Sequence, residues 1–290
     1  MEQIKAGLRR LLVDNPSPLT GTGTQTYILG TQSVAVIDPG PQDARHLEAL
    51  LTGLGGARVE AILVTHAHLD HSPLSRDLAK ATGAPIYGFG PPEAGRSAAM
   101  QALAAQGDMG GGEGTDHAFV PDVTLSDGEA ILGTGWHARA LWTPGHFSNH
   151  LSFLTDHGVF CGDLVMAWAS TLISPPDGDL TAFRSSCKKL LALADCPYFP
   201  THGEAISSGH SRLREMLAHR QAREDQILNV LRHGPARPDA LVAQIYTDVA
   251  QHLWPAAARN VLAHLIALCD NGTCRAHPAI QPDALFELAR

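Results

Sequence analysis

The segment "THAHLDH", residues 65–71, places three histidines and one aspartate directly after the apolar run "AILV". Histidine is the commonest protein ligand for zinc, and a carboxylate adds an oxygen donor. Each of these side chains alone would pass for a polar residue in a surface loop, but the four together predict a metal site. The candidate ligands are His66, His68, Asp70 and His71. Because catalytic zinc sites draw ligands from several segments, we expect further ligands elsewhere in the chain.

The hydrophobic pattern on both sides of this segment predicts an α/β domain. Residues 24–40 contain two β-rich runs that read as a hairpin, residues 43–56 have helical spacing and end at glycines, and "VEAILV" reads as a strand. The glycine-rich residues 90–117 interrupt this alternation. We interpret them as a surface insertion, with a mobile loop beside a site as the alternative.

Three later segments share one design, in which a predicted strand ends at a tight turn that holds a candidate ligand. "ALWTPGH" ends at His146, "GVFCGD" at Asp163 and "YFPTH" at His202. Functional groups in α/β proteins gather at the carboxyl ends of strands, where several loops converge. With the first segment, these make five histidines and two aspartates. Such a set suits two metal ions that share one carboxylate.

The motifs "THAHLDH", "TPGH", "CGD" and "PTHG", in this order, resemble those of the metallo-β-lactamase superfamily from about Asn15 onward. The resemblance implies an αββα sandwich and a role for each ligand. One metal ion would be bound by His66, His68 and His146, a second by Asp70, His71 and His202, and Asp163 would bridge them.

This ligand set also separates branches of the superfamily. True β-lactamases lack the bridging aspartate, which is present in glyoxalase II, ribonuclease and lactonase branches, so the resemblance disfavours antibiotic hydrolysis. The flavo-diiron branch has glutamate at the position of His68, and the nitrogen-rich set here favours zinc. We expect two Zn²⁺ ions, with iron or manganese as alternatives.

Three segments look closer still to the β-lactamase-like protein 2 family: "NPSPLTGTGTQTYILG", "TPGHFSNHLSF" and "AHRQAREDQIL". That resemblance implies a small C-terminal winged-helix domain. The composition agrees, because three helical stretches follow residue 210 and precede a short β-like tail. We predict a metallo-β-lactamase-fold catalytic domain over residues 1–217 and a winged-helix-like domain over residues 218–290.

The resemblance further implies that a hydroxide shared by two metal ions attacks the substrate, with Asp70 serving as both ligand and proton acceptor. His150, four residues after His146, matches a family histidine. We expect it to act as an orienting donor or a leaving-group contact, with an ordinary surface histidine as the alternative. Met166 and Trp168 follow Asp163 closely and are equally consistent with a pocket wall and with core packing.

Charge and composition limit the remaining function classes. A net charge of -8 gives no global attraction to nucleic acid or to an anionic membrane. No signal peptide or membrane-spanning stretch is recognisable, so we expect a cytoplasmic protein without a membrane partner. The five cysteines lack CxxC spacing and are interpreted as free thiols.

The sequence therefore leads to a dinuclear zinc-dependent hydrolase of a small ester, thioester or lactone. Two alternatives stay open: an endoribonuclease or phosphodiesterase acting on single-stranded RNA, and a winged-helix nucleic-acid-binding regulator whose metal site is structural. A small molecule is the expected partner, nucleic acid is less favoured, and homodimer formation is left open.

Overall fold

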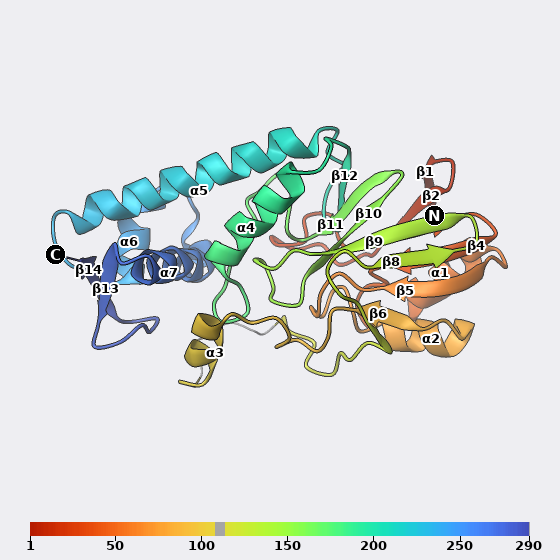
Figure 1. The fold of residues 1–290 in the computed structure, drawn as a ribbon, viewed down its shortest axis with the longest axis horizontal. Helices are drawn as coiled ribbons and strands as arrows, with labels where there is room; N and C mark the ends of the chain where they lie inside the picture. The colour runs from red at the N-terminus through yellow and green to blue at the C-terminus, as the bar shows by residue number, and fades with distance from the viewer. Residues whose placement is uncertain (108–113, 290) are drawn as a thin grey trace.

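The protein was analysed as a computed structural model that describes residues 1–107 and 114–289. In this part of the chain, a seven-stranded and a five-stranded sheet pack face to face (Figure 1). The first sheet has the order β1 (Glu2–Lys5), β2 (Leu8–Leu12), β3 (Gln25–Gly30), β4 (Ser33–Ile37), β5 (Arg58–Leu63), β6 (Ile86–Gly88) and β7 (Val123–Thr124). The second has the order β12 (Tyr198–Pro200), β11 (Gly158–Gly162), β10 (Leu151–Thr155), β9 (Trp136–Trp142) and β8 (Ala130–Gly133).

Alternation along the strands explains why the sheets are covered on both faces. In β3, Tyr27 and Leu29 point into the core between the sheets, whereas Ile28 points to the outer face. Helices α1 (Ala44–Leu54) and α2 (Ser75–Thr82) bury that outer face. Strands with two apolar faces require a layer on each side. The predicted αββα sandwich is therefore correct, with α4 (Leu180–Leu191) and α5 (Gly209–Leu231) covering the second sheet.

The predicted hairpin and the predicted helix after it are both present in the structure. The strands β3 and β4 pair antiparallel and form the predicted hairpin. Helix α1 begins after Asp43, whose carboxylate accepts a hydrogen bond from the Arg45 backbone, and ends at Gly55. Gly55 has φ 60, a left-handed conformation that glycine adopts without strain and that commonly ends helices.

The C-terminal part contains α5, α6 (Pro238–Ile245), a short 3₁₀ helix (Gln251–Leu253), α7 (Trp254–Asp270) and the hairpin of β13 (Cys274–His277) and β14 (Leu285–Leu288). Helices followed by a two-stranded wing form the predicted winged-helix arrangement. Figure 1 shows α5 running from the sheets to this unit. Leu213 of α5 packs in the core beneath α4, whereas Ile227 packs in the C-terminal core. The same helix thus continues across the predicted division between residues 217 and 218, which stays a prediction.

The interpretation of residues 90–117 as a surface insertion is wrong for its described parts. Helix α3 (Ala98–Ala104) buries Met100 and Leu103 in the C-terminal core. Thr115 pairs with His68 through a backbone bridge, so the end of this segment lies beside the histidine-rich loop. Residues 108–113, which contain most of the glycine-rich run, lie outside the described residues. Among the described helices, none combines the length and the apolar character needed to cross a bilayer.

Candidate metal centre

The histidine-rich loop begins where β5 ends, and a buried carboxylate from the neighbouring strand fixes its start. Asp38 directly follows β4 and accepts hydrogen bonds from the Thr65 backbone N–H and hydroxyl, both at 2.7 Å. The loop then turns tightly, because the backbone N–H groups of His71 and Ser72 both donate to the His68 carbonyl at 3.0 Å. This turn brings the ring of His71 back to the ring of His66, with the two centroids 4.1 Å apart.

Three of the predicted ligands converge at the first position. His66 Nε2 lies 2.8 Å from His68 Nδ1, which in turn lies 3.2 Å from His146 Nε2. Ring nitrogens that surround a zinc ion each lie about 2.0–2.1 Å from it. Nitrogens this close to one another and facing a common point therefore form a three-ligand set. His146 arrives from the loop after β9, as predicted.

Three of the remaining four predicted ligands, Asp70, His71 and His202, form a second set next to the first. Asp70 Oδ2 lies 3.2 Å from His202 Nε2 and 3.6 Å from His71 Nε2. Asp163 Oδ2 lies 3.3 Å from His202 Nε2 and 3.5 Å from His71 Nε2, and also 3.8 Å from His146 Nε2. Its carboxylate thus faces nitrogens from both sets.

Two buried polar atoms at this point have no hydrogen-bond partner within the described structure: His71 Nε2 and Asp163 Oδ1. Buried polar atoms are nearly always satisfied, so unpaired atoms on two neighbouring candidate ligands need an explanation. Imidazole nitrogens and carboxylate oxygens are ligands of divalent transition metals. The described residues can accordingly hold metal ions in groups of three: His66, His68 and His146; His66, His71 and Asp163; Asp70, His71 and His202.

Electrostatics differ between the two sets. Burial lowers the pKa of His68 to about 3, and it holds the pKa of His66 well below its ordinary value. Both imidazoles are therefore neutral near pH 7, the form that binds a metal. Burial also lowers the pKa of His202, but Asp163 outweighs this and raises that pKa to about 10. Without metal ions, the second set is a group of ion pairs.

Asp38 is a site residue that the sequence analysis missed. Its side chain is fully buried, and its Oδ2 accepts hydrogen bonds from Thr201 and from His71 Nδ1, both at 3.0 Å. Donation of the Nδ1 proton leaves His71 Nε2 free to face the second set. The signal was available, because Asp38 follows a predicted strand in the same way as the ligands do.

His150 lies behind the first set. It has no exposed surface, so the alternative of an ordinary surface histidine is wrong. Its Nδ1 lies 3.0 Å from the Thr143 hydroxyl, and its ring centroid lies 5.2 Å from that of His66. A Cβ added at Gly162 would come within 2.5 Å of His150 Nε2, so the ring fills the space beneath the strand that leads to Asp163.

The two candidate wall residues differ in position. Met166 is buried in the core, whereas 47% of Trp168 is exposed. A Cβ added at Gly203 would lie 2.6 Å from the Trp168 ring, and one added at Gly21 would lie 3.4 Å from it. The indole therefore lies over the peptide that directly follows His202. The five cysteines are free thiols, as predicted, and Cys161 is fully buried.

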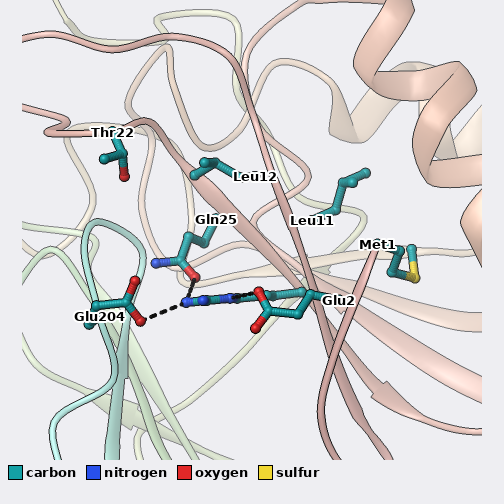
Figure 2. Close-up of a pocket in the computed structure, with 8 residues that line it drawn as sticks. Met1, Glu2, Leu11, Leu12, Thr22, Gln25 and Glu204 are labelled. Atoms are coloured by element: carbon teal, nitrogen blue, oxygen red, sulfur yellow. Dashed lines mark hydrogen bonds and ion pairs between the residues drawn. The ribbon is translucent and has the colours of Figure 1, made fainter.

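A separate pocket of about 390 Å³ lies near the start of the chain and includes Glu204, two residues after His202. Figure 2 shows Glu2, Gln25 and Glu204 pointing toward a common point. Arg10 occupies that point and bonds to all three. Because Arg10 is already bonded to these three side chains and no candidate metal ligand lines the pocket, we do not assign the reaction to it.

Comparisons with known proteins agree with this arrangement. The model of the Metallo-beta-lactamase superfamily matches residues 19–202, and that of the Beta-lactamase associated winged helix domain matches residues 238–279. The Beta-lactamase-like protein 2 homolog of Drosophila melanogaster is 29% identical over 287 residues, which cover 94% of this chain and 91% of the relative. A metallo-beta-lactamase family protein of Thermus thermophilus superposes with a TM-score of 0.76 at 28% identity, covering 99% of this chain and 100% of its own.

A further relative has a more specific name. The Atrochrysone carboxyl ACP thioesterase of Aspergillus fumigatus is 27% identical over 233 residues, which cover 77% of this chain and 64% of the relative. The family matches and these similarities span both the candidate metal centre and the C-terminal unit.

Proposed function

The chain belongs to the metallo-beta-lactamase superfamily, and from this premise we propose that it is a dinuclear zinc hydrolase of small esters, thioesters or lactones. As a member of that superfamily with a thioesterase among its relatives, it is a metal-dependent hydrolase. The observation that carries the finer proposal is the position of Asp163, whose Oδ2 faces His71, His202 and His146 within 4 Å.

This geometry supports a site for two ions with one shared ligand. The first ion is assigned to His66, His68 and His146, the second to Asp70, His71 and His202, and the bridge to Asp163. Five imidazoles favour zinc over harder cations. Elemental analysis of the purified protein distinguishes zinc from the alternatives iron and manganese.

When bound, a pair of divalent ions supplies a Lewis acid for the substrate oxygen and activates water near neutral pH. The protein side chains determine how that water and the substrate are oriented. Asp70 has 28% of its side chain exposed, compared with 9% or less for His71, His202 and Asp163. It is therefore the ligand of the second set that faces solvent, and we assign it as the proton acceptor. His150 is assigned an orienting role, because its buried ring packs against His66 and Gly162.

Apolar side chains next to the candidate ligands favour an acyl substrate. Trp168 lies exposed over Gly203, and Leu69, in the histidine-rich loop next to Asp70, is 46% exposed. Exposed apolar side chains beside a polar site are typical of ligand contacts. The thioesterase name of one relative points in the same direction.

The winged-helix match is the one observation that favours the RNA-cleaving alternative. Binding of a phosphate backbone depends on accessible lysine and arginine. Two arginines of α5 are poorly placed to contact phosphate groups. Arg220 is buried, and the Arg223 guanidinium lies 3.9 Å from the Tyr246 ring centroid. The net charge of -8 also disfavours a polyanion.

The test is a comparison of kcat/KM for acyl thioesters, lactones, nitrophenyl phosphodiesters and single-stranded RNA over a salt series. We expect thioester or lactone hydrolysis that depends on zinc and weakly on salt. Efficient RNA cleavage that falls steeply with rising salt would overturn the small-substrate assignment. Stable zinc binding without turnover of any of these substrates would favour the regulatory alternative.

A further inference from the structure

A chain of hydrogen bonds connects the C-terminal helices to the candidate ligand His146. His146 Nδ1 lies 2.8 Å from the Leu172 carbonyl oxygen, which can only accept. The N–H of the same peptide group, that of Ile173, donates to Asn260 Oδ1 at 3.0 Å. One peptide plane is thus held at its carbonyl by the candidate ligand and at its N–H by a side chain of α7.

Arg220 of α5 fixes the position of Asn260. It donates from Nη1 to Asn260 Oδ1 at 3.0 Å and from Nη2 to the Thr171 carbonyl. Only 3% of Arg220 is exposed, and its guanidinium carbon lies 5.5 Å from the Phe183 ring centroid of α4. A planar guanidinium can hold two acceptors in fixed directions, which a flexible amine cannot.

The same loop is held at its other end. Arg212, two turns earlier on α5, donates to the carbonyl of Met166 at 2.7 Å and to that of Ala169 at 2.8 Å. The segment from residue 166 to residue 173, which carries Trp168 and contacts His146, is therefore bound along its length by the C-terminal helices.

We propose that Asn260, held by Arg220, is a positioning residue for the metal ligand His146. This inference rests on the proposed metal site. Donation of the Nδ1 proton to the Leu172 carbonyl leaves His146 Nε2 unprotonated and directed at the first set. Asn260 prevents that peptide plane from rotating, and its bond to the N–H polarises the carbonyl that orients the ring. The C-terminal unit is thereby part of the metal centre.

The decisive variants are Asn260→Ala and Asn260→Asp. Aspartate keeps an acceptor oxygen for the Ile173 N–H and for Arg220, whereas alanine removes it. Asn260 is half-buried in a helix, so alanine is compatible with its surroundings. Asn229→Ala is the matched control, because Asn229 lies on α5 away from the residues that contact the loop.

Two readouts do not depend on turnover: zinc affinity by competition with a chelator, and the visible absorption spectrum of the cobalt-substituted protein. We expect Asn260→Ala to lower the affinity for one of the two zinc ions about tenfold. This is within the range for residues that orient metal ligands. Its cobalt spectrum should change, whereas Asn260→Asp and Asn229→Ala should resemble the wild type.

Wild-type affinities and an unchanged cobalt spectrum in Asn260→Ala would overturn this inference and leave the proposed function intact. A wild-type protein that binds no metal would overturn both. If Asn260→Ala fails to fold, Arg220→Lys is the second test, because a lysine ammonium lacks the planar guanidinium whose two nitrogens bond Asn260 and the Thr171 carbonyl in fixed directions. We expect it to weaken the same ion, and unchanged affinity there would overturn the inference.

Discussion

Asp38 Oδ2 lies 3.0 Å from His71 Nδ1, in the fully buried space between the loops that carry the candidate ligands. The same oxygen accepts from Thr65, which precedes His66, and from Thr201, which precedes His202. One carboxylate thus determines the orientation of His71 and joins two ligand-bearing loops.

Asp38→Asn should disturb this orientation. The Thr65 backbone N–H requires the amide oxygen, so the amide NH₂ would face His71 Nδ1. His71 would then carry its proton on Nε2, the nitrogen that faces the second set. We expect zinc affinity to fall about 10- to 100-fold. Chelator competition measures it, with the exposed Asp156→Asn as the control; equal affinities in the two variants would show that Asp38 does not orient the ligand.

Asp163→Ala should weaken metal binding at both sets, because the Asp163 carboxylate faces nitrogens of each. Zinc content, measured by elemental analysis, should fall below two ions per chain. Turnover should fall to that of the chelator-treated wild type. The exposed Asp156→Ala should keep both ions. A variant that retains two ions and wild-type turnover would exclude Asp163 as the bridge.

Trp168→Ala should alter selectivity for acyl length with little effect on stability, because 47% of the side chain is already exposed. Each buried CH₂ contributes about 0.8 kcal/mol, so loss of the indole should reduce kcat/KM more for long acyl thioesters than for acetyl thioesters. We expect about a tenfold difference for a chain that loses two such contacts. Leu132→Ala, at an 81% exposed position of the β8–β9 hairpin, is the control. A uniform loss for all chain lengths would argue against an acyl contact.

The ion pair of Glu224 and Arg184 predicts a pH dependence of stability. Arg184 Nη2 donates to Glu224 at 2.6 Å. His264 of α7 also faces this carboxylate, at 3.7 Å. Burial raises the pKa of Glu224, but the nearby His264 and the hydrogen bond and charge of Arg184 outweigh it, so the folded pKa lies below the ordinary 4.5. The pair therefore stabilises the fold above about pH 4.5, and this contribution is lost as the pH falls through the folded pKa.

Glu224→Gln should accordingly reduce the free energy of unfolding at pH 7 by about 1–2 kcal/mol, since the amide oxygen can still accept from Arg184 but the carboxylate charge that strengthens this bond is lost. The difference from the wild type should shrink below about pH 4.5, where the wild-type carboxylate also becomes neutral. Urea unfolding of the metal-free proteins between pH 3 and pH 7 measures it. A difference that stays constant over this range would contradict the predicted pKa shift.

Local patterns in the sequence were sufficient for much of the fold and for all seven candidate ligands. Hydrophobic alternation follows directly from a two-faced sheet, and the hairpin of β3 and β4 and helix α1 carry their own turn and capping residues. The seven residues were proposed as ligands from the spacing within "THAHLDH", from their places after predicted strands and from the family resemblance, and their metal binding stays a prediction. The convergence of His66, His146 and His202 was then a consequence of sheet geometry.

Contacts between residues far apart in the chain could not be predicted from local sequence patterns. Ile173 and Asn260 are 87 positions apart, and neither belongs to a motif. The sequence left open whether His150 is exposed, and it treated Met166 and Trp168 alike. The structure buries His150 and Met166 and leaves Trp168 half exposed, because the packing of neighbouring loops decides which side chains water reaches. A local sequence pattern indicates only the periodicity of a single helix or strand, not which distant residues that element contacts. Only the folded chain brings α5 and α7 against the loop behind His146, and that contact depends on helix packing that no short segment encodes.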